Sequence, residues 1–170
     1  ISKSLFIIGA GIDSTFLNDN AVASGAIILS GNSLTRLSNF TMTGTVGSYQ
    51  GSLRISGDNK RLDNIRFNQS NGRHPIGVYG NRSNVVIDHS TFEAGGRGIN
   101  IYGDSSYWTN VAQYAPGTAY GIYIEDCIFN TTGVEVVDLN SGGAYVVRHS
   151  SINGGNLAVH GADSNARSGG

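Results

Sequence analysis

The sequence predicts an all-β chain whose short strands stack as a solenoid, and three observations support this. A six-residue phrase recurs five times, and short apolar segments that end in glycine recur between the copies. The composition, with 25 Gly, 2 Pro and 14% charged residues, suits repeated turns more than helices. The copies are LSNFTM, LDNIRF, IDHSTF, IEDCIF and VRHSSI, which start at positions 37, 62, 87, 124 and 147.

Each copy of the phrase opens and closes on an apolar residue, and its third residue is Asn, Asp or His. These are the non-glycine residues most enriched at left-handed backbone positions. The phrase therefore predicts two short strands joined by a tight bend at the third residue. The five bend residues are Asn39, Asn64, His89, Asp126 and His149. This bend also explains the two histidines without a catalytic role, including His89 beside Asp88.

The copies begin 25, 25, 37 and 23 residues apart, given their starting positions. Periods of this size are typical of solenoids, in which each repeat is buried by its neighbours. The segment that lengthens the third interval, 104–121, contains Tyr107 and Trp108. We expect it to be an aromatic loop insertion, because long loops on a rigid scaffold often carry binding residues.

The chain opens with LFIIGAGIDSTFL, from Leu5 to Leu17, which predicts a strand, a glycine turn and a second strand. A nucleotide-binding loop is the alternative for Gly9 to Gly11. The third glycine of that motif is absent, however, and no helix pattern follows.

The strands that end in glycine complete each repeat, and the segment GVEVVDLN from Gly133 fills the same place without the closing glycine. The segments that do close on glycine are AIILSG, SLRISG, PIGVYG, GINIYG and LAVHG. With the two halves of the phrase, each repeat holds three strands and no helix. We expect one right-handed, three-stranded parallel β-helix over 1–170, of about six to seven turns. No capping element is evident at either end, so we expect a fragment of a longer protein or a partner that covers the ends.

The interior of this fold should carry ladders of like residues. On the strands that end in glycine, the expected ladder is Ile55, Val78, Ile101 and Val159. On the strands formed by the first half of the six-residue phrase, it is Leu37, Leu62, Ile87, Ile124 and Val147.

Composition also bounds the partners. The net charge of -1 and the absence of a basic patch argue against nucleic acid. No segment has the about 18 consecutive apolar residues of a membrane span. The single Cys127 excludes an internal disulfide, and no cluster of three Asp marks a calcium site, so we expect no metal and no cofactor.

Side chains alternate between the two faces of a strand, so the residues between the expected inward ones on the strands that end in glycine should point outward. One predicted column reads Arg54, Gly77, Asn100, Glu135 and Ala158. The next reads Ser56, Tyr79, Tyr102, Val137 and His160. We expect Tyr79 and Tyr102 to form an aromatic ladder suited to the faces of sugar rings; the alternative is that they only cover the strands.

Glycoside hydrolysis needs two carboxyl groups, roughly 5 Å apart for retention or roughly 6.5 to 9.5 Å for inversion. Glu135 with Asp138 or Asp104 is the candidate catalytic pair, unless Glu135 is only a solvated strand charge. A lyase needs a base and a cation, for which Arg54, Arg97 and His160 are candidates. The candidate substrate-binding residues are Arg54, Tyr79, Asn100, Tyr102, Tyr107, Trp108 and His160.

The repeats resemble the pectate-lyase-like superfamily of right-handed β-helices, on the basis of LFIIGAGIDSTFL and of NVVIDHSTF from Asn84 to Phe92. The resemblance implies a substrate that lies along the outer face of one strand stack. It covers nearly the whole chain and is specific for fold. The Gly-His-Gly phrase of polygalacturonases is missing, with His160-Gly161 its nearest match, and so is the Asp-Pro-His-Asp phrase of alginate epimerases.

Two functions follow as hypotheses. The first is an extracellular or virion-associated enzyme that binds and cleaves a polysaccharide, of the phage tailspike or secreted depolymerase type. The second is a structural or receptor-binding module of a viral fibre or adhesin, without catalysis. Tailspike members of the superfamily are usually trimers, so the resemblance also implies a homotrimer.

Overall fold

The computed structural model describes residues 3–20, 25–46, 51–70, 73–93, 97–103, 118–132 and 135–160. Of these residues 57% form strands and none forms a helix, which confirms the all-β class. Accordingly, the described part offers no helix of the length and hydropathy needed to cross a membrane. The strands are β1 (Leu5–Ile8), β2 (Phe16–Asp19), β3 (Ile27–Leu29), β4 (Thr35–Thr45), β5 (Leu53–Ile55), β6 (Lys60–Ser70), β7 (Ile76–Tyr79), β8 (Val85–Asp88), β9 (Thr91–Glu93), β10 (Ile99–Tyr102), β11 (Ile122–Glu125), β12 (Ile128–Asn130), β13 (Glu135–Asn140), β14 (Val146–Arg148), β15 (Ser151–Ile152) and β16 (Asn156–Val159).

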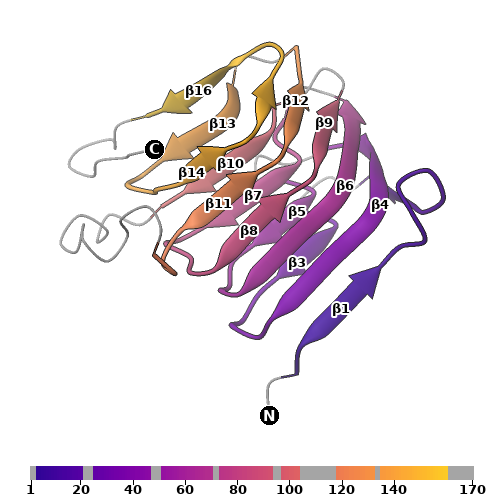
Figure 1. Cartoon of the computed structure of the whole chain (residues 1–170), viewed down its shortest axis with the longest axis horizontal. Helices are drawn as coiled ribbons and strands as arrows, with labels where there is room; N and C mark the ends of the chain where they lie inside the picture. The colour runs from indigo at the N-terminus through magenta and orange to yellow at the C-terminus, as the bar shows by residue number, and fades with distance from the viewer. Residues whose placement is uncertain are drawn as a thin grey trace.

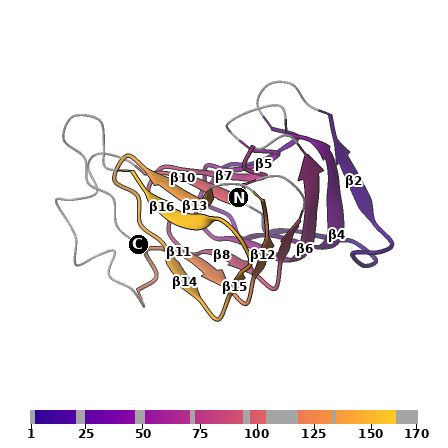
Figure 2. The ribbon, with the colours of Figure 1, turned by 90° about the horizontal axis from the view of Figure 1, so that it is seen from above.

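The strands form two sheets, and every strand pair in the described residues is parallel. The six-stranded sheet has the order β16-β13-β10-β7-β5-β3. The ten-stranded sheet contains the path β14-β11-β8-β6-β9-β12-β15, with β4 beside β6 and both β1 and β2 beside β4. Figure 1 shows the strands stacked side by side, and in Figure 2 β8 and β11 lie across the interior from β7, β10 and β13.

The larger sheet turns a corner within each copy of the recurring phrase. All five predicted bend residues have positive φ: Asn39 61°, Asn64 51°, His89 48°, Asp126 51° and His149 54°. In the first two copies the strand continues through the bend, so that β6 pairs with β8 before Asn64 and with β9 after it. In the later copies the bend separates two strands. The predicted bend is confirmed in every copy.

The core consists of ladders of equivalent residues from successive repeats. The expected inner residues Ile55, Val78 and Ile101 are 0% exposed. The closing residues of three phrases stack as rings, with centroids 4.8 Å apart for Phe67 and Phe92 and 4.6 Å apart for Phe92 and Phe129. Val159 pairs with Leu139 as that ladder requires, but it is 49% exposed because β16 is the last strand of its sheet in the described chain.

Lys60 is a buried charge that joins adjacent repeats. Its side chain is 1% exposed, and its Nζ donates hydrogen bonds to the carbonyl oxygens of Gly31 (2.9 Å), Ser33 (2.7 Å) and Asp58 (2.7 Å). Burial lowers the pKa of the Lys60 ammonium, opposed by the charge of Asp58. One side chain thus donates to three carbonyl groups, of which that of Ser33 also accepts a hydrogen bond from Thr35 Oγ1 at 3.3 Å.

We expect Lys60→Met to lower the free energy of unfolding by about 2 to 4 kcal/mol. The substitution keeps the aliphatic stem but leaves buried carbonyls without a donor, and a hydrogen bond to a charged group is worth about 1.5 to 3 kcal/mol. Urea denaturation followed by circular dichroism measures the change. The matched control is Lys3→Met at an exposed lysine, and equal stabilities of the two variants would contradict this role.

Candidate functional site

The outer face of the six-stranded sheet carries the predicted columns, with one correction. Strand pairing aligns Arg54, Gly77, Asn100, Asp138 and Ala158 in one column. The prediction that Glu135 occupies this column is wrong, because Asp138 does. The neighbouring column contains Tyr79, Tyr102 and Asn140, so Val137 was also misplaced.

The cause is the register of β13. Val137 and Leu139 pair with Ile99 and Ile101 and are therefore the inward residues of this strand. Val136 and Val137 are both 0% exposed, and the pairing with β16 shifts between Glu135 and Val137. Such a β-bulge adds one residue to a strand and breaks its alternation of faces, which redirects the neighbouring side chains.

The bulge brings two carboxyl groups together. Residues three apart on a regular strand point to opposite faces. Here one oxygen of Glu135, one of Asp138 and one ring nitrogen of His74 all lie within 4.8 Å of one another. The predicted pairing of Glu135 with Asp138 is thus present geometrically, and the two groups are closer than the roughly 6.5 to 9.5 Å of inverting glycosidases.

His74 is the member of this group that sequence reasoning missed. Its side chain is 1% exposed, and its Nε2 lies 4.0 Å from Oδ2 of Asp138. Neither ring nitrogen makes a hydrogen bond with any residue that the structure describes. Burial, with a smaller contribution from the charge of Arg97, lowers the pKa of the His74 imidazole to about 3. The ring is therefore neutral at physiological pH.

Arg97 and His160 lie beside the two carboxylates. Arg97 NH1 lies 2.8 Å from Oε2 of Glu135, and His160 Nε2 lies 3.1 Å from Oδ1 of Asp138 and 3.8 Å from Oε1 of Glu135. Burial and the charge of Asp138 raise the pKa of the Tyr145 hydroxyl. We call His74, Arg97, Glu135, Asp138 and His160 the Glu135–Asp138 cluster.

The cluster follows from the correct register. Ile76, Ile99 and Val137 are partners on β7, β10 and β13. The residues two positions before them are His74, Arg97 and Glu135. A single repeat position therefore supplies three of the five side chains. Aligning the strands on Val137 instead of Val136 would have shown this column in the sequence.

The side chains in this cluster differ in their access to solvent. The exposed fraction of the side chain is 51% for His160, 33% for Arg97, 16% for Glu135 and 10% for Asp138. His74 therefore forms the floor of the cluster and His160 its rim.

The predicted aromatic ladder is present on the same sheet. The rings of Tyr79 and Tyr102 stack with centroids 5.0 Å apart and planes 19° apart, and the guanidinium of Arg54 lies 4.7 Å from the centre of the Tyr79 ring. Burial and the neighbouring Tyr102 raise the pKa of Tyr79 to about 12, against the effect of Arg54. Asn140 donates a hydrogen bond to Asn100, at 3.3 Å, between this ladder and Asp138.

Three predicted site residues, Asp104, Tyr107 and Trp108, lie outside the described residues. The structure therefore brings together Glu135, Asp138 and His160, with Asn100, Tyr102, Tyr79 and Arg54 along the same sheet.

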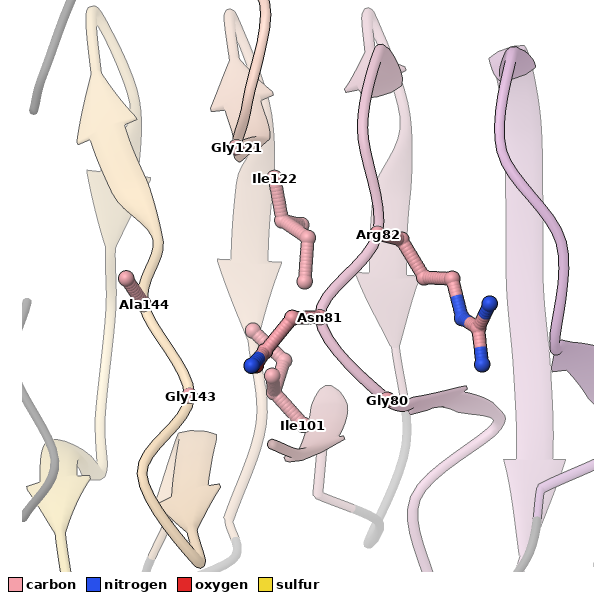
Figure 3. A pocket seen from close by; sticks show the side chains of 8 residues that line it. All are labelled: Gly80, Asn81, Arg82, Ile101, Gly121, Ile122, Gly143 and Ala144. Atoms are coloured by element: carbon pink, nitrogen blue, oxygen red, sulfur yellow. The ribbon is translucent and has the colours of Figure 1, made fainter. Parts of the chain in front are cut away.

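Hollows elsewhere in the described part of the chain offer less chemistry. An open one of about 490 Å³ lies against β8 and β11, where its described lining includes one carboxylate, Glu125, which is paired with Arg148 at 2.6 Å. A second, of about 10 Å³, has room for a single water. Figure 3 shows its lining, with the Arg82 guanidinium directed away from the other side chains. Its lining residues are Gly80, Asn81, Arg82, Ile101, Gly121, Ile122, Gly143 and Ala144.

Comparison with known proteins found no matching family model, no matching curated protein and no matching solved structure.

Proposed function

We propose that the chain is a three-faced, right-handed parallel β-helix that binds a polysaccharide along the outer face of the six-stranded sheet and hydrolyses it at the Glu135–Asp138 cluster. The proposal includes an extracellular or virion-associated location, because the capsular and plant polysaccharides proposed as substrates lie outside cells. The observation that carries it is the convergence of Glu135 and Asp138 on a sheet that also presents stacked tyrosines.

The spacing of the carboxyl groups favours retention of configuration. Their nearest oxygens lie within 4.8 Å, whereas inversion needs room for a water between the groups, at roughly 6.5 to 9.5 Å. In a retaining reaction one carboxylate attacks the anomeric carbon and the other group protonates the leaving oxygen. That second group then activates the water that releases the sugar.

The partners of the two carboxyl groups suggest their roles. Arg97 is always protonated and lies 2.8 Å from Glu135, which suits Glu135 to the role of ionised nucleophile. Asp138 lies 3.1 Å from His160, at the rim where the leaving group would depart. We therefore assign the acid and base role to Asp138.

The aromatic ladder supports polysaccharide as the ligand. Tyr102 lies on β10, the strand that pairs with β13, and two residues along that strand from Asn100, which is the partner of Asp138. Strand spacing is about 4.8 Å and the rise is about 3.3 Å per residue, so the backbone positions of Tyr102 and Asp138 are about 8 Å apart, a distance that a bound oligosaccharide spans. The ring faces and the Arg54 guanidinium together offer the stacking and hydrogen bonds that sugars accept.

The test is incubation of the protein with a panel of neutral and acidic capsular and plant polysaccharides. We expect new reducing ends without the absorbance of an unsaturated product. Unsaturated product would identify a lyase and overturn the hydrolytic mechanism. Binding without cleavage on every polymer would instead favour the receptor-binding module of a fibre or adhesin.

We expect Tyr102→Ala to weaken binding of a polysaccharide substrate about tenfold, since one ring contact is worth about 0.5 to 1.5 kcal/mol beyond its buried area. Isothermal titration calorimetry with an inactive Glu135→Gln background measures the change without turnover. Tyr120→Ala is the control, because Tyr120 is 42% exposed and lies outside the six-stranded sheet. An equal loss in both variants would argue against the ladder as the binding surface.

A further inference from the structure

The starting observation is a buried histidine without a hydrogen bond. The His74 side chain is 1% exposed, and both of its ring nitrogens are buried without a donor or acceptor partner among the described residues. Burying a polar group in this way is unfavourable unless another species completes its bonding. The nearest candidates for sharing that species are the carboxylates of Asp138, at 4.0 Å, and of Glu135.

The separations of the three ligand atoms are close to those around a bound transition-metal ion. Zn²⁺ binds histidine nitrogen and carboxylate oxygen at about 2.0 to 2.2 Å, which in a tetrahedron places ligand atoms about 3.3 to 3.6 Å apart. The atoms of His74, Glu135 and Asp138 lie within 4.8 Å of one another. Movements of about 1 Å would close the site.

We propose that His74, Glu135 and Asp138 bind a divalent transition-metal ion, with Zn²⁺ as the best match. One nitrogen and two carboxylate oxygens form a three-ligand set that leaves a fourth position open. Imidazole favours Zn²⁺ over Mg²⁺ and Ca²⁺, which select oxygen ligands and higher coordination. His160, 3.1 Å from Asp138 and 3.8 Å from Glu135, stands where a fourth ligand could approach.

Arg97 opposes the metal. Its guanidinium lies 2.8 Å from Glu135 and contributes a positive charge beside the proposed ion. Metal binding must therefore displace or weaken this ion pair. Removal of the charge by Arg97→Gln is expected to tighten binding about tenfold, whereas loss of a ligand weakens it.

A bound ion would also regulate the proposed hydrolysis, and this consequence rests on the proposed function. Coordination occupies the carboxylate oxygens that would attack the sugar and transfer the proton. Zn²⁺ is therefore expected to inhibit cleavage, and a chelator is expected to restore it. The ion binds whether or not the chain is an enzyme.

The test measures metal binding directly on the whole chain. Isothermal titration with Zn²⁺, in competition with a chromophoric chelator, should give one ion per chain. His74→Phe should weaken binding at least 100-fold while keeping a ring in the same space. Glu135→Gln is the second variant, in case the first fails to fold. The control is His149→Asn, because His149 is exposed and Asn tolerates its positive φ of 54°.

Each outcome bears on the proposal. Loss of binding in His74→Phe or Glu135→Gln, with binding kept in His149→Asn and tightened in Arg97→Gln, supports the site. Equal binding in the wild-type and His74→Phe proteins, or binding of Ca²⁺ as tight as Zn²⁺, overturns it. Acceleration of hydrolysis by Zn²⁺ would agree with the metal site but would overturn the acid and base roles of the carboxylates.

Discussion

Glu135→Gln is expected to lower the rate of polysaccharide hydrolysis by about 10³-fold or more while the protein still binds its substrate. The amide has nearly the shape of the carboxylate but cannot attack the anomeric carbon, and general acid or base groups alone contribute about 10² to 10⁴-fold. Asp138→Asn should cause a loss of similar size, because both carboxyl groups are needed in each step. Reducing-end release under saturating substrate measures the rate.

Glu93→Gln is the matched control for this loss. Glu93 closes β9 on the other sheet, with a side chain that is 39% exposed and 4.0 Å from Arg66. We expect full activity in this variant. Circular dichroism confirms that each protein is folded, and calorimetry confirms that substrate still binds. An unchanged rate in Glu135→Gln would remove Glu135 from the reaction, and an unchanged rate in both carboxamide variants would move the catalytic site elsewhere.

The repeats could be predicted because their signals are local. A left-handed residue in a strand is restricted to few amino acids, so Asn39, Asn64, His89, Asp126 and His149 marked the bends directly. The stacked Tyr79 and Tyr102 could also be predicted, since PIGVYG and GINIYG are the same length and align without a gap. Where consecutive repeats have equal length, a column of the sheet can be predicted from the sequence.

The site could be predicted only in part because it depends on register. In β13 the apolar run Val136-Val137 gives two alignments, and the register of its pairing with β10 and β16 decides between them. Glu135 and Asp138 were therefore named as a pair but assigned to the wrong positions. His74 was missed because the column of residues two positions before Ile76, Ile99 and Val137 becomes visible only when β13 is aligned on Val137.

His74 should make the protein unusually sensitive to acid. The pKa of its imidazole is about 3 in the folded chain, against an ordinary value of 6.5. Below pH 6.5 the unfolded chain therefore binds a proton that the folded chain does not, so stability is lost as the pH falls from 6.5 towards 3. Each pH unit in this window corresponds to about 1.4 kcal/mol, so lowering the pH from 6.5 to 4 should cost about 3 kcal/mol.

His74→Phe removes this proton uptake, and we expect the variant to lose about 3 kcal/mol less than wild-type protein over the same range. Urea denaturation at a series of pH values, with a chelator present, measures the difference. The carboxylates of Glu135 and Asp138 and the guanidinium of Arg97 face His74 in both proteins, so their own contributions largely cancel in the comparison. His149→Asn should follow wild-type protein, because His149 is exposed. Parallel pH profiles for wild-type and His74→Phe would show that the imidazole gains a proton as readily when folded as when unfolded, which is incompatible with a buried, neutral ring against the two carboxylates.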